Sequence, residues 1–343
     1  MATIKDIAQM TGVSPTTVAN VIHGRTSKVS EETQKKVKQA LAETNYTAHM
    51  GGRLLAKHGS KIIGVIIQDS TAVSDHIYDN PYQGEFLQAV EQSIGEAGYF
   101  MMFRRISTIE EGLRLVEMWN LEGLILSGSH SSEVKKWREK IQVPIVFLDM
   151  YTEYTPLAQM NVGIEDYIGG RLAGEYLVEM GHEKVAFVAQ GEVAKGIEGL
   201  DQVRGKGFQD VFKEHQLKAD ILCVPALRGP YHNYLEQFVE QMLLNYTALF
   251  FSSDLLAVQA ISHFYQHGLR LPKDLSIVSF DGTLLSQYAT PRLTVIQQDV
   301  TKKALAAIEL LIQAIKKNTT ELKSVSIPVK LVVRESVCRI EKN

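Results

Sequence analysis

Short polar residues are mixed with apolar ones in the segment VSPTTVANVIHG, which runs from Val13 to Gly24. The apolar positions recur at the spacing of one face of an α-helix, so we expect them to pack inward. They are Val18, Val21 and Ile22. Pro15, Thr16 and Asn20 then lie on the outward face, where short side chains at a helix start suit contacts with the base edges and phosphates of DNA. The alternative is a capped helix start whose polar face contacts only solvent.

Polar side chains at the ends of short apolar runs form a second set of candidates. Asp254 directly follows ALFFSS and Asp281 directly follows LSIVSF, so both carboxylates are placed to accept hydroxyl groups across a cleft. Arg204, in VRGKGF, can give a forked pair of donors to hydroxyls or a carboxylate. Four more residues are similarly placed: Tyr82, Ser127, Asp149 and Glu165. The alternative for any single acid is capping of a helix N-terminus, which suits Asp254 in particular.

Three short helices are expected before residue 46. The pattern Thr3-Ile4-Lys5-Asp6 predicts a capping box, with a helix from Ile4 to about Met10. Ser14-Pro15 is a good start for the second helix, and a third runs from Ser30-Glu31-Glu32 to about Glu43. Two helices with a four-residue break form the helix-turn-helix plan. Its packing requirements are met by a small residue at the crossing, a turn residue that tolerates positive φ and an apolar plug, which are Ala8, Gly12 and Val18.

Charge is unevenly distributed along the 343 residues. Residues 1–60 hold eight Lys and Arg against four Asp and Glu, whereas the rest holds 28 against 35. A basic head on an acidic body indicates a polyanionic partner for the head, although a solvated helix face over 31–43 is the alternative.

The remaining composition argues against several classes of protein. The two cysteines, Cys223 and Cys338, are far apart and form no CxxC pattern, so neither a disulfide framework nor a metal site is expected. No signal peptide or membrane-length apolar run is found, which favours a cytoplasmic protein without a membrane partner. P-loop, GxSxG and HExxH motifs are missing, and GGRLAG (169–174) does not open a helix after a strand. We therefore expect no cofactor and no enzymatic activity.

From residue 61 on, apolar runs alternate with amphipathic stretches. Buried parallel strands are predicted at 62–68, 99–103, 123–127, 143–149, 184–189, 219–224, 248–253 and 275–281. Helices are predicted at 81–97, 109–119, 131–140, 166–180, 202–214, 232–244 and 254–267. Two such series predict two α/β lobes, each a doubly wound parallel sheet with helices on both faces. Ligands of this architecture bind at the carboxyl ends of the strands, here in the cleft between the lobes.

The segments ATIKDIAQMTGVSPTTVANVIHG, VSEETQKKV and LAETNY together resemble the head of the lactose/purine repressor (LacI/GalR) family. The resemblance implies that Pro15, Thr16 and Asn20 read bases. It implies DNA backbone contacts for Thr3, Lys5, Thr17, His23, Arg25 and Lys28. Ala19 stands where the family has serine, and His23 where it has asparagine, so those two contacts depart from the pattern.

The next segment, residues 47–60, corresponds to the family's hinge helix, between a DNA-binding domain at 1–46 and a core at 61–343. In the family this helix orders on DNA and wedges a leucine into the minor groove, which implies that role for Leu55 and a backbone contact for Arg53. Ala48, His49 and Gly51-Gly52 depart from the family pattern. Each glycine costs about 1 kcal/mol relative to alanine inside a helix, so we expect an unusually disordered hinge without DNA. A plain flexible linker is the alternative.

The resemblance continues through the core, in blocks such as EGLILSGS, TALFFSSDLLAVQAI and IPVKLVVRESV. It implies a periplasmic-binding-protein-like fold in which the chain crosses between lobes three times. Lobe one is expected at about 61–160 plus 293–322, and lobe two at about 161–292 plus 323–340. The effector site would comprise Tyr82, Ser127, Asp149, Glu165, Arg204, Arg228, Asp254 and Asp281. Arg204 and Arg228 together suggest an anionic effector, such as a sugar derivative.

These observations predict a sequence-specific DNA-binding transcription regulator. We expect a repressor of carbohydrate-related genes that binds a pseudo-palindromic operator as a homodimer and is switched by a small-molecule effector in the cleft. A co-repressor effector or an activator role is the nearest alternative. A sugar-binding receptor and a sugar-modifying enzyme are more distant ones, because neither would need the basic head.

Overall fold

The computed structural model of the chain describes residues 2–22, 24–44, 46, 59–68, 80–129, 131–152, 155–191, 197, 199–225, 239–240 and 245–341. The chain divides into two units, residues 1–60 and 61–343. No helix within these described ranges is long and apolar enough to cross a membrane.

The first unit contains three helices around one small core. They are α1 (Ile4–Thr11), α2 (Pro15–Ile22) and α3 (Glu31–Glu43). Thr3 and Asp6 form the expected reciprocal capping box, and Gly12 ends α1 with a φ of 69°. The core residues are Ile7, Ala8, Val18, Val21, Val37 and Ala40. The predicted helix-turn-helix packing is therefore confirmed.

The second unit begins with a six-stranded sheet whose neighbouring strands are all parallel. Its order is β13-β7-β4-β3-β1-β2. The strands are β1 (Ile62–Gln68), β2 (Phe100–Ile106), β3 (Gly123–Ser127), β4 (Ile145–Leu148), β7 (Asn161–Ile164) and β13 (Val325–Ile327). The apolar runs expected at 62–68 and 123–127 match β1 and β3, whose residues are almost all buried.

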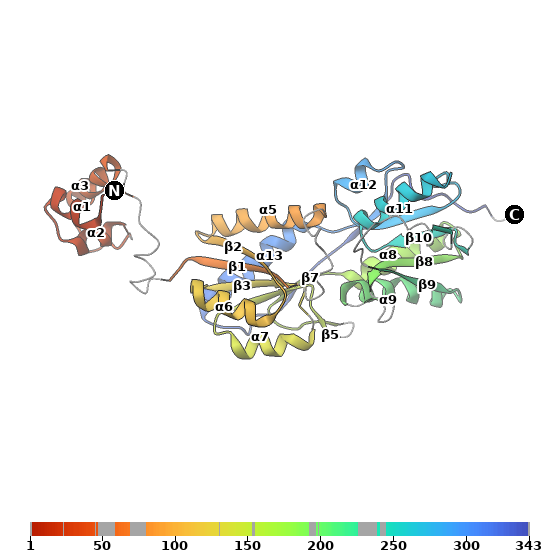
Figure 1. Cartoon of the computed structure of the whole chain (residues 1–343), viewed down its shortest axis with the longest axis horizontal. Coiled ribbons are helices and arrows are strands. Elements are labelled where there is room, and N and C mark those ends of the chain that lie inside the picture. Colours follow the sequence, from red (N-terminus) through yellow and green to blue (C-terminus); the bar gives the residue numbers. More distant parts are fainter. Residues whose placement is uncertain are drawn as a thin grey trace. The chain divides into compact units, whose positions relative to one another are not determined.

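Helices cover both faces of this first sheet, which together with them forms lobe one. They are α5 (Pro81–Glu96), α6 (Ile109–Trp119), α7 (Val134–Lys140, after the short 3₁₀ turn η2, Ser131–Glu133) and α13 (Val300–Lys317). The helices α5 and α13 lie on one face and α6 and α7 on the other (Figure 1). Side chains of α5 and α13 pack in one core cluster, and Ile109 and Trp137 from α6 and α7 pack in another. A two-stranded ribbon, β5 (Tyr151–Thr152) with β6 (Thr155–Pro156), follows β4.

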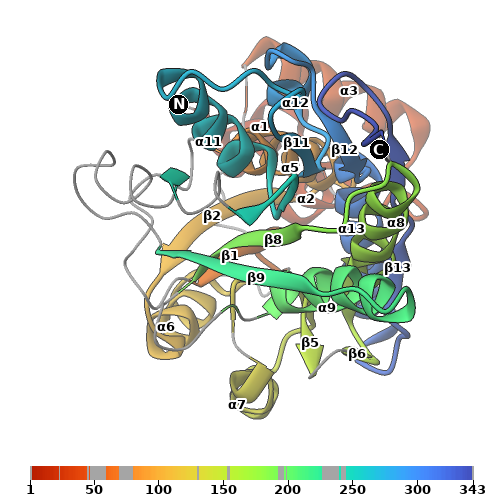
Figure 2. The same ribbon diagram turned by 90° about the vertical axis from the view of Figure 1, so that its right-hand side faces the viewer.

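A second six-stranded sheet forms lobe two, in the order β14-β12-β11-β10-β8-β9. The strands are β8 (Val185–Gly191), β9 (Ala219–Pro225), β10 (Ala248–Phe251), β11 (Ser276–Asp281), β12 (Thr294–Gln297) and β14 (Lys330–Val332), of which β14 is antiparallel to its neighbour. The helices are α8 (Asp166–Glu179), α9 (Gly199–Glu214), α11 (Asp254–Gln266) and α12 (Leu284–Tyr288). Figure 2 shows α11 on one side of the strands β8 and β9, with α9 on the other.

The helices α8 and α9 pack with their backbones in close approach. A Cβ atom added to Gly170 would lie 2.0 Å from the carbonyl oxygen of Arg204, and one added to Gly207 would lie 2.1 Å from that of Tyr167. The glycine-rich segment 169–174 therefore has a packing function, because only glycine allows this approach.

The chain crosses between the lobes three times, as expected, but each crossing lies one strand later than predicted. β7 and β13 pair within the first sheet and β12 pairs within the second. The boundaries expected after residues 160, 292 and 322 each precede one of these strands. The sheet to which each of these three strands belongs is decided by the strand with which it pairs. An apolar run in the sequence indicates a buried strand but not its pairing partner. Most of the helix expected at 232–244 lies outside the described residues.

Candidate functional site

The outward face of α2 has the composition that the sequence predicted. Ser14 Oγ accepts a hydrogen bond from Thr17 N at 3.1 Å and so caps the helix start. Val18 and Val21 are buried, Pro15 and Thr16 are exposed, and Asn20 is half-buried. The core behind α2 fixes which side chains remain accessible.

The residues expected to contact the DNA backbone differ in how free their side chains are. Lys5, Arg25 and Lys28 are exposed. The Thr3 hydroxyl already donates to Asp6 Oδ2 at 2.8 Å, so its capping function competes with a phosphate contact. Thr17 is half-buried, with its hydroxyl 2.9 Å from that of Ser14. His23, Arg53 and Leu55 lie outside the described residues.

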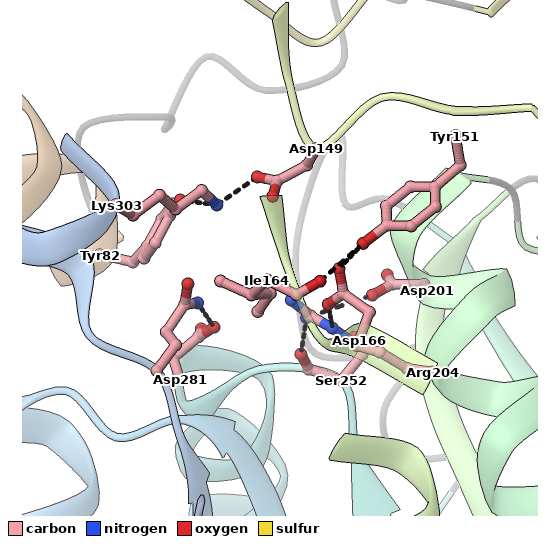
Figure 3. Close-up of polar contacts among 11 residues, drawn as sticks. Tyr82, Asp149, Tyr151, Ile164, Asp166, Asp201, Arg204, Ser252, Asp281 and Lys303 are labelled. Atoms are coloured by element: carbon pink, nitrogen blue, oxygen red, sulfur yellow. Dashed lines mark hydrogen bonds and ion pairs between the residues drawn. The ribbon is translucent and has the colours of Figure 1, made fainter. Parts of the chain in front are cut away.

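In the core, the lobe-one part of the candidate site is an ion pair between Asp149 and Lys303. Asp149 follows β4 with a φ of 50°, and Lys303 projects from the first turn of α13. Lys303 Nζ donates to Asp149 Oδ2 and also to the Tyr82 hydroxyl, at 2.9 Å for the latter (Figure 3). The lysine side chain is only 1% exposed. A buried charge of this kind needs such partners.

The pKa values of this group reflect burial and charge in competition. Burial raises the pKa of Tyr82 to about 12, although the Lys303 charge lowers it. Burial lowers the pKa of Lys303, but the charge interactions and hydrogen bonds with Asp149 and Tyr82 together outweigh burial, so the pKa lies above its usual value. Lys303 therefore remains protonated in the cleft.

The lobe-two part of the site is centred on Arg204 in α9. Its Nε donates to Asp166 Oδ1 at 2.7 Å, and its NH1 donates to the carbonyl oxygen of Ser252 at 2.8 Å. The guanidinium lies 3.7 Å from the ring centroid of Phe280. Asp201 is 3.6 Å from Arg204 NH1, and burial raises the pKa of Asp201 to about 7. Arg204 is therefore held by groups of its own lobe.

Asp254 and Asp281 have different environments, although the sequence placed them in the same class. Asp254 accepts hydrogen bonds from Ser279 Oγ at 2.5 Å and from Thr283 N and Oγ1 at 2.7 and 2.9 Å. Both of its oxygens are thus engaged within lobe two, which indicates a positioning role. Asp281 is 6% exposed and accepts a hydrogen bond from Gln298 Nε2 at 2.7 Å.

The remaining predicted site residues are less connected. Ser127 and Glu165 are half-buried, and their side chains make no hydrogen bond within the described part of the chain. Arg228 lies outside that part. No cluster of His, Cys, Asp and Glu among the described residues is arranged to hold a metal ion.

Tyr151 contacts Asp166, the partner of Arg204, and was not predicted. Its hydroxyl donates to Asp166, at the start of α8, and lies 3.1 Å from the carbonyl oxygen of Ile164. Burial raises the pKa of both Asp166 and Asp281, and the charges of Arg204 and Lys303 lower it, so the charges of the two lobes also interact. Figure 3 shows Asp149, Lys303 and Tyr82 facing Asp281, Asp166 and Arg204. The candidate site therefore contains residues of both lobes.

Lys303, Asp166, Asp201 and Gln298 were also missed. One signal for Lys303 was available, since this lysine interrupts the apolar stripe of Val300, Ala304 and Ala307. The other three residues have polar neighbours and give no such signal.

Two segments match known families. Residues 3–49 match the bacterial regulatory proteins of the lacI family, and residues 175–337 match the periplasmic binding protein-like domain. The chain is 31% identical over 356 residues to the HTH-type transcriptional repressor PurR of Pasteurella multocida (strain Pm70), covering 98% of this chain and 99% of that protein. It is 32% identical over 345 residues to the ribose operon repressor of Halalkalibacterium halodurans, covering 98% and 97%.

Solved structures show the same fold. A crystal structure of the Lac repressor dimer bound to operator and the anti-inducer ONPF matches with a TM-score of 0.82 and 24% identity, over 98% of this chain and 99% of that one. This chain belongs to the lacI family of bacterial regulatory proteins, with a helix-turn-helix DNA-binding domain followed by a periplasmic-binding-protein-like effector-binding core.

Proposed function

We propose that this protein represses carbohydrate-related genes by binding a pseudo-palindromic operator as a homodimer, and that a small molecule in the interlobe cleft changes its DNA affinity. The observation that carries the proposal is the accessible face of α2. Pro15 and Thr16 are exposed and Asn20 is half-buried, while Val18 and Val21 fix the helix from behind. The full-length similarity to two repressors supports the same function.

The base-reading residues set the expected type of specificity. None of Pro15, Thr16 and Asn20 is an arginine, the residue that makes the strongest guanine contact. We propose that α2 reads its half-site through small contacts, including apolar ones to thymine methyl groups. Leu55 and the deformability of the DNA would then supply much of the remaining selectivity.

A selection of bound sequences from a random duplex pool tests this function, followed by fluorescence anisotropy on the selected operator. We expect affinity to fall steeply with salt because the lysines and arginines of the head displace counterions. Asn20→Ala should cost about 1–3 kcal/mol and relax specificity, whereas Lys28→Ala should weaken binding to all duplexes and reduce the salt slope by about one. Lys316→Ala is the matched control, because Lys316 is an exposed lysine of the effector-binding unit, residues 61–343, rather than of the DNA-binding head.

A separate variant tests the proposed role of Leu55 in the hinge. Leu55→Ala should weaken operator binding, and unchanged affinity would show that the wedge contributes nothing. Selection of no preferred sequence by the wild type, with salt-independent affinity, would refute the regulator function itself.

The direction of the switch is open to direct measurement. A ligand that weakens operator binding is an inducer, and one that strengthens it is a co-repressor. The receptor and enzyme alternatives lose support because the relatives over the full length are transcription regulators. We therefore propose that the core binds its ligand without chemical turnover.

A further inference from the structure

Lys61 has an unusual backbone conformation at the point where the hinge segment joins the core. Its φ is 57°, in the left-handed region that a residue with a side chain rarely adopts. Gly59, two residues earlier, has a φ of 73°, and Ser60 between them is completely buried. The chain therefore enters β1 at Ile62 along a locally strained path, and such strain persists only where surrounding contacts impose it.

Contacts from two neighbouring segments engage every polar group of Lys61. Its backbone N–H donates to Glu122 Oε1 at 2.7 Å, and its carbonyl oxygen accepts from Phe100 N at 2.7 Å. Its Nζ lies 4.3 Å from the centroid of the Tyr99 ring. Glu122 directly precedes β3 and Phe100 begins β2, so the segments of the two strands that flank β1 hold Lys61 from both sides.

The contact from Glu122 is the one that strand pairing does not explain. The pairing of β1 with β3 begins at Ile63 and Gly123, and Glu122 N donates to the carbonyl oxygen of Ile62 at 2.9 Å. The Glu122 side chain extends this hydrogen bonding by one residue toward the hinge. A hydrogen bond to a carboxylate is stronger than one between neutral groups, so it can hold a strained residue.

Resting on the regulator function proposed above, we propose that Glu122 and Lys61 form a clamp that preorganises the hinge for sequence-specific DNA binding, with Glu122 as the positioning residue. The hinge has to order on the operator before Leu55 can enter the minor groove, and ordering costs conformational entropy. A fixed C-terminal end leaves fewer conformations to lose. Non-specific binding depends on phosphate contacts of the head and needs no ordered hinge.

The clamp and simple electrostatics predict opposite effects when the Glu122 side chain is removed. Loss of an acidic residue reduces repulsion from the phosphates, so electrostatics alone predicts tighter binding to every duplex. Loss of the clamp predicts weaker binding to the operator and unchanged binding to random duplexes. The sign of the change on the operator therefore separates the two effects.

Fluorescence anisotropy on the full chain tests the clamp, with the selected operator and a random duplex of equal length at one salt concentration. Glu122→Ala should weaken operator binding about tenfold and change random-duplex binding by less than about twofold. Glu122→Gln keeps an oxygen acceptor and should bind the operator within about threefold of the wild type. The proposal is overturned if Glu122→Ala binds the operator as tightly as the wild type, or if both duplexes lose affinity equally.

Glu117→Ala is the matched control, because Glu117 is an exposed acid of α6 that does not contact Lys61. It should not weaken operator binding, and a loss equal to that of Glu122→Ala would overturn the clamp. Thermal unfolding checks that each variant is folded. If Glu122→Ala is not, Glu122→Leu removes the acceptor while keeping more of the side-chain volume and decides the same comparison.

Amide hydrogen exchange without DNA measures the clamp directly. The amide hydrogen of Lys61 should exchange faster in Glu122→Ala than in the wild type. Equal exchange rates would show that Glu122 does not hold this backbone, which overturns the assignment. If the wild type selects no preferred DNA sequence, the regulator function fails, whereas the exchange rates still decide whether Glu122 fixes Lys61.

The Leu55→Ala background tests whether the clamp acts through the hinge. Without the leucine wedge, an ordered hinge contributes less, so Glu122→Ala should reduce operator affinity by a smaller factor there than in the wild-type chain. Strictly additive losses would overturn the action of Glu122 through the hinge.

Discussion

The Tyr151 hydroxyl donates a hydrogen bond to the buried carboxylate of Asp166, and the same carboxylate accepts from Arg204 Nε at 2.7 Å. Tyr151 begins the ribbon strand β5 that follows lobe one's β4, whereas Asp166 begins α8 of lobe two. This contact ties the lobes together at the first crossing. Burial raises the pKa of Asp166, so each donor to this carboxylate matters for stability.

Tyr151→Phe should destabilise the core by about 1–3 kcal/mol, because it leaves a buried acceptor without its donor. Urea denaturation measures the free energy of unfolding. Tyr246→Phe is the matched control, since its hydroxyl donates to Asp220 at 3.0 Å in a less buried position. Equal losses of unfolding free energy in the two variants would show that the buried Tyr151–Asp166 hydrogen bond contributes no more to stability than the less buried Tyr246–Asp220 hydrogen bond.

Lys303→Met should cost about 3–5 kcal/mol of unfolding free energy, because it leaves the Asp149 carboxylate buried without its cation. The double variant Lys303→Met/Asp149→Asn should recover part of that loss, and the difference gives the coupling energy of the pair. Lys302→Met, one residue earlier and exposed, should change stability by less than about 0.5 kcal/mol. Strictly additive effects of the two site substitutions would contradict an energetic coupling between them.

Stability should fall as pH rises from 5 to 8. Burial, followed by the charge of Asp281, raises the pKa of Asp254 to about 7, so the folded state holds this proton more tightly than the unfolded chain does. The resulting stability is fully present below the ordinary aspartate pKa and is lost as pH rises through about 7. Asp254→Asn should therefore reduce the pH slope of the unfolding free energy. Burial also raises the pKa of Asp201 to about 7, so part of the pH slope should remain in the Asp254→Asn variant.

The control for this pH effect is Asp274→Asn. Hydrogen bonds from Arg270 lower the pKa of Asp274 to about 2, so this residue loses its stabilising effect only in strong acid. Its substitution should leave the slope between pH 5 and 8 unchanged. The assignment to Asp254 fails if its variant keeps the full wild-type slope.

Gly170→Ala should destabilise lobe two by about 1–3 kcal/mol, because the new methyl group would collide with the Arg204 carbonyl and force α8 from α9. The displaced Arg204 should also weaken ligand binding. Gly84→Ala tests glycine in an open helix position, since nothing lies within 4 Å of its added Cβ, and should stabilise by about 0.5–1 kcal/mol. Thermal unfolding of both variants separates packing from helix propensity, and stabilisation of both would contradict the close approach.

Local patterns in the sequence determined most of the elements. The helix predicted at 109–119 matches α6 because Thr108 caps its start and Asn120 ends it in the left-handed region. Thr3 and Gly12 did the same for α1. The outward position of Pro15 and Thr16 also followed from sequence alone, since an eight-residue helix with valines on one face has only one way to pack.

Only the tertiary structure decided the partners in the cleft. Lys303 and Asp149 are 154 positions apart, and a lysine on an amphipathic helix ordinarily faces water. Asp254 and Asp281 both belong to sequence segments that follow apolar runs, yet Ser279 and Thr283 donate to Asp254 whereas the amide of Gln298 donates to Asp281. Helix caps and apolar periodicity depend on near neighbours and can be read from the sequence. The charge balance of a site depends on which distant side chains are buried together, and that is fixed only when the two lobes fold.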